Sequence, residues 1–305
     1  MAAEVRTAVV FPGQGTQRPG MALPWRAHPA WRIVEDAEAL VGAPLGHLIT
    51  DASAEDLART REAQLAILIT SLVAWEAARE HVPPPVAFAG HSLGQVTALI
   101  AAGVLELGAG IEFATARANA TQAAADAHPG RMAALLGADL AQAEAACDAV
   151  ADCWVANDNA PGQVVVAGTP EGLAAASDAA TSLGVRRVSA LNVGGAFHTP
   201  LMDDAVALLE THLADTAMHD ATVPVVANDD ATAVLDATEW RARSARHVAR
   251  RVRWREVQST LADLGAVRFV EVGAGTMLAA LAKRTVPEIA VVNIATPADL
   301  DGLRA

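Results

Sequence analysis

The sequence of 305 residues contains no tyrosine, one lysine and two cysteines, and these shortages already exclude several kinds of protein. Cys147 and Cys153 lie outside any Cys-x-x-Cys motif and have no histidine cluster beside them, so we expect two reduced thiols and no metal site. A stretch of 18 or more residues free of charges and helix breakers is also lacking, which leaves no candidate membrane span. The first fifteen residues have no basic segment followed by a long apolar run, so we expect no secretion signal and a cytoplasmic location.

Positive charge is scarce as well. The chain has 22 Lys and Arg against 35 Asp and Glu, a formal net charge of −13, which argues against general nucleic-acid binding. Arginines nonetheless gather in one segment, RARSARHVARRVRWR at 241–255. Two interpretations of this segment stay open: a solvated helix face with carboxylates packed nearby, or a landing site for an acidic partner or for the phosphates of a ligand.

Apolar residues make up 52% of the chain, enough for one large domain or for a large and a small one. At both ends of the chain, short apolar runs typical of buried strands break at glycine or proline and lead into helical patterns. The middle differs: strand-like runs and alanine-rich helices follow in the order β–α–β–β–α–β, which is the ferredoxin-like pattern. We therefore predict an α/β fold with a hydrolase-like large domain and a mostly parallel sheet (1–128 and 196–305), plus an inserted ferredoxin-like small domain (129–195).

The pentapeptide GHSLG, residues 90–94, satisfies the pattern G-x-S-x-G. It stands between a predicted strand and a predicted helix, where flanking glycines permit a strained turn that exposes the hydroxyl of Ser92. The helix that follows directs N–H groups toward developing negative charge. Ser92 is therefore a candidate nucleophile, and the alternative is a packing serine at a tight turn.

A serine nucleophile needs a base, and the chain has nine histidines. His198, in GGAFHTPLM, lies among small residues after a strand and just before a helix, so it is the best candidate, although such a histidine can also be a capping or core residue. His91 is adjacent to Ser92 and is expected to point elsewhere, while His247 is the one histidine late enough for a hydrolase-type order. The others lie in polar or loop-like surroundings and are predicted at the surface: His28, His47, His81, His128, His212 and His219.

Two further segments contain candidate binding groups. FPGQGTQ (11–17) lacks the residues of a phosphate loop, but Gln14 could offer its backbone N–H to an oxyanion; the alternative is an ordinary turn. Arg117 lies on a predicted helix with few other charges. It either extends from an apolar helix to solvent or grips a substrate carboxylate through two parallel hydrogen bonds.

Six motifs stand in the order seen in malonyl-CoA:acyl-carrier-protein transacylases, and the related acyltransferase domains of polyketide synthases share it. The resemblance spans about residues 7–297. The motifs are FPGQGTQ, GHSLG followed by TALIAAGVL, ATARANATQ with Arg117, NAPGQVVVAG, AFHTPLM and VEVGAGTML. Six motifs in order are far more specific than any one alone.

The resemblance implies a role for several residues. Ser92 resembles the family's nucleophile and His198 its base. The oxyanion hole would be the main-chain N–H groups of Gln14 and Leu93. Arg117 resembles the residue that binds the free carboxylate of malonate.

Two further roles also follow from the resemblance. Phe197 in AFH is similar to the form found in malonyl-selective members, where it crowds out an α-methyl branch. The RVRWREV segment resembles the stretch whose main-chain carbonyl orients the histidine ring, and this assigns that carbonyl to Arg253. The chain departs from the usual family pattern at Gln95, where glutamate is common, at Arg253, where glutamine is common, and at Ala274, where proline is common.

The implied reaction is ping-pong transfer of a malonyl group from coenzyme A to the phosphopantetheine thiol of a holo acyl carrier protein, in fatty-acid or polyketide synthesis. The coenzyme A thioester is a substrate, and no bound cofactor is expected. The acidic carrier is expected to dock on Arg186, Arg187 or the 241–255 segment. We expect a monomer with neither nucleic acid nor membrane as partner.

Three other functions compete with this one. A hydrolase-type esterase would place its acid and then its histidine late in the chain. An acyltransferase-like hydrolase or thioesterase would clear acyl groups from carriers, but would gain nothing from the carboxylate clamp at Arg117. A non-enzymatic carrier-binding scaffold would have no need of Ser92 and His198.

Overall fold

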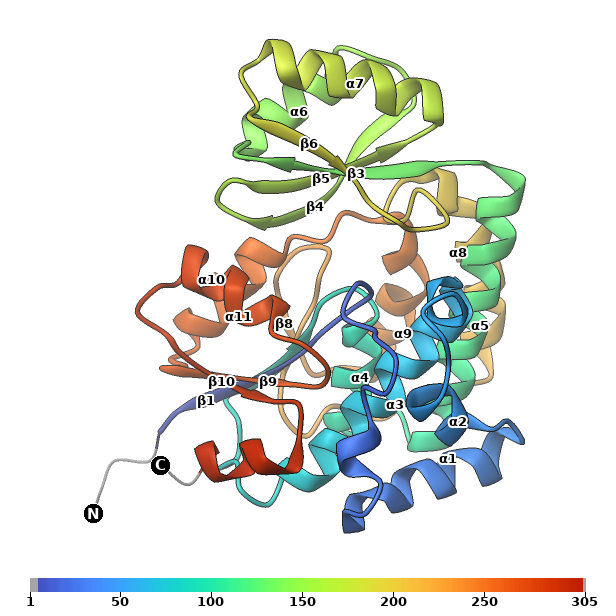
Figure 1. Ribbon diagram of the computed structural model, residues 1–305, viewed down its shortest axis with the longest axis vertical. Coiled ribbons are helices and arrows are strands. Elements are labelled where there is room, and N and C mark those ends of the chain that lie inside the picture. Colours follow the sequence, from blue (N-terminus) through green and yellow to red (C-terminus); the bar gives the residue numbers. More distant parts are fainter. Residues whose placement is uncertain (1–4, 304–305) are drawn as a thin grey trace.

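Two sheets organise the computed structural model, which describes residues 5–303 (Figure 1). The larger has six strands in the order β10-β9-β1-β2-β7-β8, all parallel to their neighbours except β8, which runs antiparallel to β7. The smaller has four antiparallel strands in the order β4-β5-β3-β6. The strands are β1 (Thr7–Phe11), β2 (Ala87–Gly90), β3 (Arg131–Leu136), β4 (Cys153–Ala160), β5 (Gln163–Gly168), β6 (Arg187–Ala190), β7 (Val225–Val226), β8 (Ala233–Val234), β9 (Arg268–Val272) and β10 (Ala290–Ile294).

The larger sheet is covered on both faces. Every residue of β1 is buried: Val9 and Phe11 face one hydrophobic core, while Ala8 and Val10 face another. Parallel strands with two covered faces are apolar throughout, which explains why TAVVF does not alternate. The helices are α1 (Arg32–Val41), α2 (Leu45–Thr50), α3 (Thr60–Ala78), α4 (Gly94–Ala101), α5 (Leu107–Ala127), α6 (Leu140–Asp148), α7 (Pro170–Ser182), α8 (Asp203–Ala214), α9 (Ala237–Arg246), α10 (Trp254–Asp263) and α11 (Met277–Thr285), and the short 3₁₀ helix η5 (His247–Ala249) follows α9.

The smaller sheet lies within the predicted 129–195 insertion and has the ferredoxin-like strand order. Successive residues of its strands point to opposite faces of the sheet, so they alternate between a helix-covered face and a face that borders a cavity. Ala133 and Leu135 pack with α6 and α7 in a core of their own, whereas Met132 and Ala134 face the other way and line a cavity. In Figure 1, α6 and α7 lie on the side of this sheet that faces away from the larger one.

The predicted fold class is confirmed: the chain is α/β, with a mostly parallel main sheet and an inserted antiparallel one. The sequence did not single out β8 or β10, which lie at the two edges of the main sheet, where side chains are less buried and the apolar pattern is weaker. The arginine-rich 241–255 segment belongs to α9, η5 and the start of α10. Within residues 5–303, no helix is both long enough and apolar enough to span a membrane.

Candidate active site

The carboxyl edge of the main sheet gathers the polar residues that the sequence singled out. In the parallel pair β1–β2, Phe11 stands opposite Gly90, so the turns after both strands leave the sheet side by side. β7 pairs with the other side of β2 and brings Asn228 to the same edge. In open α/β sheets, the crevice beyond the carboxyl ends of the strands is where ligands bind.

The turn at Ser92 depends on its two glycines. Ser92 has φ 51°, a left-handed conformation that is uncommon for a residue with a side chain. A Cβ on Gly90 would lie 1.9 Å from the backbone of Gly94, and one on Gly94 would lie 2.2 Å from the carbonyl oxygen of Phe11. Neither glycine can therefore be replaced without moving main chain. The Ser92 N–H donates to Oδ1 of Asn228 (2.8 Å), whose Nδ2 donates to the Gly90 carbonyl (2.9 Å).

His198 lies against Ser92. It also has positive φ, 64°, and its N–H donates to the Val248 carbonyl (2.8 Å). Nε2 is 2.8 Å from Oγ of Ser92, while Nδ1 is 3.0 Å from the carbonyl oxygen of Arg250 and 3.1 Å from that of His247. Carbonyl oxygens only accept, so Nδ1 carries the proton and Nε2 offers its lone pair to the Ser92 hydroxyl. Burial, and then the charge of Arg117, lower the pKa of His198 to about 3, which keeps the ring neutral.

The prediction that the Arg253 carbonyl orients the histidine ring is wrong. The carbonyls that face His198 belong to His247, the first residue of η5, and to Arg250, which caps the end of η5. Arg253 lies three residues farther on. Its N–H donates to the Asn228 carbonyl (2.8 Å), and its guanidinium pairs with Glu256 (2.6 Å).

Arg117 reaches the site from the middle of α5. It is 4% exposed; Nη1 donates to Oε1 of Gln64 (2.6 Å), and Nη2 lies 3.3 Å from Oγ of Ser92. Its Nε has no hydrogen-bond partner, and no carboxylate within residues 5–303 pairs with the group. Desolvation lowers the pKa of Arg117 to about 10, so the guanidinium stays charged at neutral pH. A buried cation without a counter-ion favours an anionic ligand beside Ser92.

A cavity of about 410 Å³ joins these groups, and Gln14 and Phe197 line it too. The amide N–H groups of Gln14 and Leu93 make no hydrogen bond to any residue of the described chain, so both can donate to an oxyanion. The small sheet forms the opposite wall. Its lining residues are Met132, Ala134, Asn157, Asn159, Gln163 and Val165.

The positions of His91 and of the six predicted surface histidines agree with the predictions, and His247 is a further histidine close to the site. His91 points away from Ser92: its Nε2 lies 2.8 Å from Oδ1 of Asn159. His247, to which the sequence assigned no role, is buried behind His198. The six predicted surface histidines are exposed or half-buried: His28, His47, His81, His128, His212 and His219.

Sequence reasoning missed Asn228 and Gln64. Asn228 follows the apolar VPVVA run directly, and a polar side chain right after a buried strand is a signal of the carboxyl edge of a sheet. Gln64 is a buried amide in an otherwise apolar part of α3. Within residues 5–303 no group of three His, Cys, Asp or Glu side chains is arranged to hold a metal ion.

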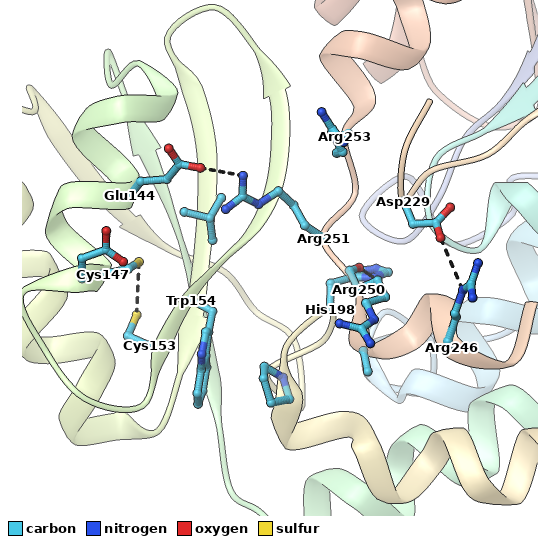
Figure 2. A pocket seen from close by; sticks show the side chains of 14 residues that line it. Glu144, Cys147, Cys153, Trp154, His198, Asp229, Arg246, Arg250, Arg251 and Arg253 are labelled. Carbon is cyan, nitrogen blue, oxygen red and sulfur yellow. Dashed lines mark hydrogen bonds and ion pairs between the residues drawn. The ribbon is translucent and has the colours of Figure 1, made fainter. Parts of the chain in front are cut away.

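A second cavity, of about 620 Å³, reaches His198 from the side of the arginine-rich segment (Figure 2). Arg250 is exposed there and has no carboxylate partner in the described chain. Most arginines of the segment pair with carboxylates, which supports the first interpretation for them. The pairs are Arg243 with Asp229, Asp230 and Glu239, Arg246 with Asp229, Arg251 with Glu144, Arg253 with Glu256, and Arg255 with Asp158.

Comparisons with known proteins agree with this geometry. Residues 8–300 match the family model "Acyl transferase domain". The chain is 32% identical to a malonyl CoA-acyl carrier protein transacylase of Bacillus subtilis, over 97% of this chain and 95% of that one. An acyl-carrier-protein S-malonyltransferase structure from Burkholderia pseudomallei superposes with TM-score 0.94 at 33% identity, covering 99% and 100% of the two chains.

A second structure carries a partner. It is described as a type II polyketide synthase acyl carrier protein in complex with its malonyl-transacylase, and it matches with TM-score 0.94 at 31% identity over 98% of each chain. The predicted resemblance and the predicted enzyme class are thus confirmed. From residue 8 to residue 300, this chain belongs to the acyl transferase domain family and is an acyltransferase.

Proposed function

We propose that this chain transfers a malonyl group from coenzyme A to the phosphopantetheine thiol of an acyl carrier protein through an ester on Ser92. The observation that carries the proposal is the Arg117 guanidinium, buried, without a carboxylate partner in the described chain, and 3.3 Å from the Ser92 hydroxyl. A malonyl group provides the missing carboxylate and places its thioester carbonyl beside the nucleophile. The names of the curated relatives point to the same substrates.

In the first half-reaction His198 Nε2 takes the proton of the Ser92 hydroxyl as its oxygen attacks the thioester carbonyl. The N–H groups of Gln14 and Leu93 would hold the oxyanion, and losing one such donor typically raises the barrier by about 3 kcal/mol. His198 then returns the proton to the leaving coenzyme A thiolate. The Arg250 and His247 carbonyls fix the ring as a carboxylate would, but without a full negative charge to stabilise the imidazolium.

In the second half-reaction the carrier thiol attacks the Ser92 ester, and His198 again moves the proton. The arginine-lined cavity in Figure 2 opens onto His198, which makes it a suitable approach for the phosphopantetheine arm. Exposed arginines at Arg186, Arg187 and Arg250 complement an acidic carrier. Phe197 lines the cavity of about 410 Å³ beside Ser92, the acyl cavity, and would crowd a branch at the α-carbon of the acyl group.

Intact-mass spectrometry after brief mixing with malonyl-CoA, acetyl-CoA and methylmalonyl-CoA tests the proposal, with Ser92→Ala as the control. The expected result is a malonyl adduct on the wild type alone, which disappears when holo carrier protein is added. Steady release of free coenzyme A without an adduct would indicate the acyl hydrolase instead. No adduct and no turnover with any donor would contradict an acyl-enzyme mechanism altogether.

A further inference from the structure

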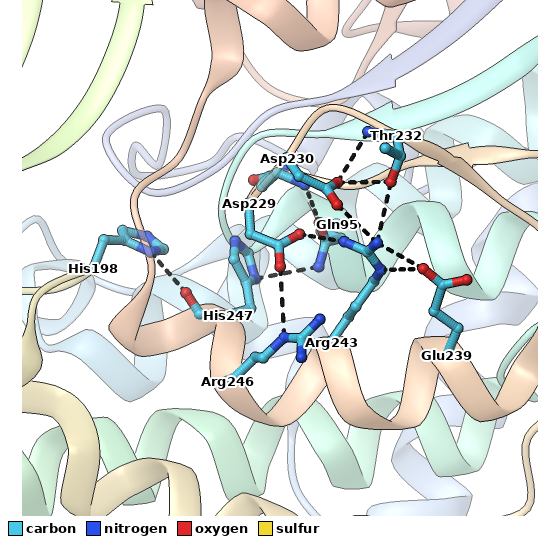
Figure 3. A network of polar contacts seen from close by, with 10 residues as sticks. Gln95, His198, Asp229, Asp230, Thr232, Glu239, Arg243, Arg246 and His247 are labelled. Atoms are coloured by element: carbon cyan, nitrogen blue, oxygen red, sulfur yellow. Dashed lines mark hydrogen bonds and ion pairs between the residues drawn. The ribbon is translucent and has the colours of Figure 1, made fainter.

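Five residues form a closed circuit of hydrogen bonds around the nucleophile and the base. The Ser92 N–H donates to Asn228 Oδ1 (2.8 Å), and the Asn228 N–H donates to Gln95 Oε1 (2.9 Å). Gln95 Nε2 then lies 3.3 Å from Nδ1 of His247, whose carbonyl accepts from His198 Nδ1 (3.1 Å). The Ser92–His198 contact of 2.8 Å closes the circuit. Figure 3 shows the Gln95, His247 and His198 part of it.

We infer that Gln95 is a positioning residue, which holds the support of the nucleophile and the support of the base in one fixed relation. The two polar atoms of its side chain contact one partner each. Oε1 accepts from Asn228, which anchors the Ser92 turn, and Nε2 contacts His247, whose carbonyl accepts from the base His198. Gln95 is 3% exposed and touches neither reacting atom, so its effect on the reaction is indirect. The inference rests on the proposed function only in taking Ser92 and His198 as the reacting pair.

The circuit requires an amide at position 95. A backbone N–H only donates, so the oxygen of Gln95 must face Asn228, and its NH₂ group must face His247. His247 can accept there only as a neutral ring with its lone pair on Nδ1. Burial, and then repulsion from Arg117 and from the His198 and His91 rings when they are protonated, hold the pKa of His247 well below its ordinary value, which keeps that lone pair free.

The elements that carry the circuit are themselves fixed. The buried Arg243 of α9 pairs with Asp229 (2.7 Å) and Asp230 (2.8 Å), next to Asn228, and with Glu239 (2.6 Å) on its own helix. Figure 3 shows this cluster directly beside Gln95 and His247. α9 and the loop after β7 therefore form one unit, and Gln95 connects that unit to the helix that begins behind Ser92.

A glutamate at position 95 could not support the same circuit. A carboxylate accepts but does not donate. With glutamate at 95, His247 would have to carry its proton on Nδ1, and a negative charge would stand close to the base. Gln95 and His247 are thus a matched neutral pair in this chain.

The test is the rate at which a fluorophosphonate phosphonylates Ser92, with loss of fluoride as the hydroxyl oxygen attacks phosphorus. The rate of this reaction measures how reactive the Ser92 hydroxyl is, and no acyl donor is needed. Gln95→Met keeps the size of the side chain and removes both contacts, and we expect labelling about 10- to 100-fold slower. Gln258→Met is the matched control, because Gln258 is equally buried but bonds only to Asn159, Trp254 and Thr285. It should stay within about two-fold of wild type.

Gln95→Glu supplies an independent readout. Its carboxylate raises the pKa of His198 through the circuit, so the acid limb of the labelling rate should move to higher pH than in wild type. Equal rates for Gln95→Met and Gln258→Met, or a Gln95→Glu profile that coincides with wild type, would overturn the inference. Failure of the proposed function looks different: malonyl transfer would be absent while the order of labelling rates remained.

Discussion

Two cavities meet at His198, and they use arginine in opposite ways. The acyl cavity has one guanidinium, that of Arg117, which is 4% exposed and has no carboxylate partner in the described chain. The cavity of about 620 Å³ in Figure 2, the outer cavity, is lined by four arginines. Three of these pair with Asp or Glu, and their side chains are still 33–44% exposed. A charge acts far more strongly where water is excluded. The single buried arginine should therefore bind an anionic group more strongly than the four exposed or partly exposed arginines do. Burial, more than the number of charges, decides what each cavity does.

Replacing Arg117 by Ala should have the largest effect. The malonyl carboxylate loses its partner, and sites of this kind discriminate by about 10⁴-fold, so kcat/KM for malonyl-CoA should fall by that order and acetyl transfer should appear. Arg117→Lys, which keeps the charge but not the fork of donors, should lie between the two. Rates of coenzyme A release with both donors measure the change. A variant that still prefers malonyl-CoA would contradict the carboxylate clamp.

An intermediate effect concerns acid stability, because three histidines in and around the site are buried. Burial lowers the pKa of His91, His198 and His247 in the folded protein. Below about pH 6.5 these histidines bind protons in the unfolded chain but stay neutral in the folded protein, so the free energy of unfolding should fall as pH drops. The slope should reach at most about 1.4 kcal/mol per pH unit for each histidine.

Urea unfolding between pH 4 and 7 measures this slope. His198→Asn removes one of the three groups and should give a shallower slope by up to that amount per pH unit. An unchanged slope would show that His198 protonates in the folded protein as readily as in the unfolded chain.

The smallest effect should come from the outer cavity. Arg250→Ala removes an exposed guanidinium while its backbone carbonyl still faces His198, so acylation by malonyl-CoA should be unchanged. The KM for the acidic carrier should rise about three-fold at low salt, and the difference should vanish as salt screens the pair. Arg253→Ala, whose guanidinium is already held by Glu256, is the matched control. Equal KM values for both variants would remove Arg250 from the docking surface.

Much of the site follows from local sequence. GHSLG determines a strained turn, because side chains in place of Gly90 and Gly94 would collide with backbone. His198 was identifiable from its surroundings. The orienting carbonyl was not, because a backbone group carries no residue-specific signal: resemblance pointed to Arg253, whereas the carbonyls that face the ring are those of His247, which begins η5, and Arg250, which caps it.

The sequence by itself determined the alternation of strands and helices, the antiparallel insertion and the turn that exposes Ser92, since each depends on residues close together along the chain. Tertiary structure alone decided which groups surround that turn. Asn228 lies 136 residues from Ser92, and His247 lies 152 residues from Gln95. These contacts exist because β7 pairs with β2, and because Arg243 of α9 pairs with Asp229 and Asp230 just after β7. Such pairing is set by the burial of whole faces rather than by any short motif.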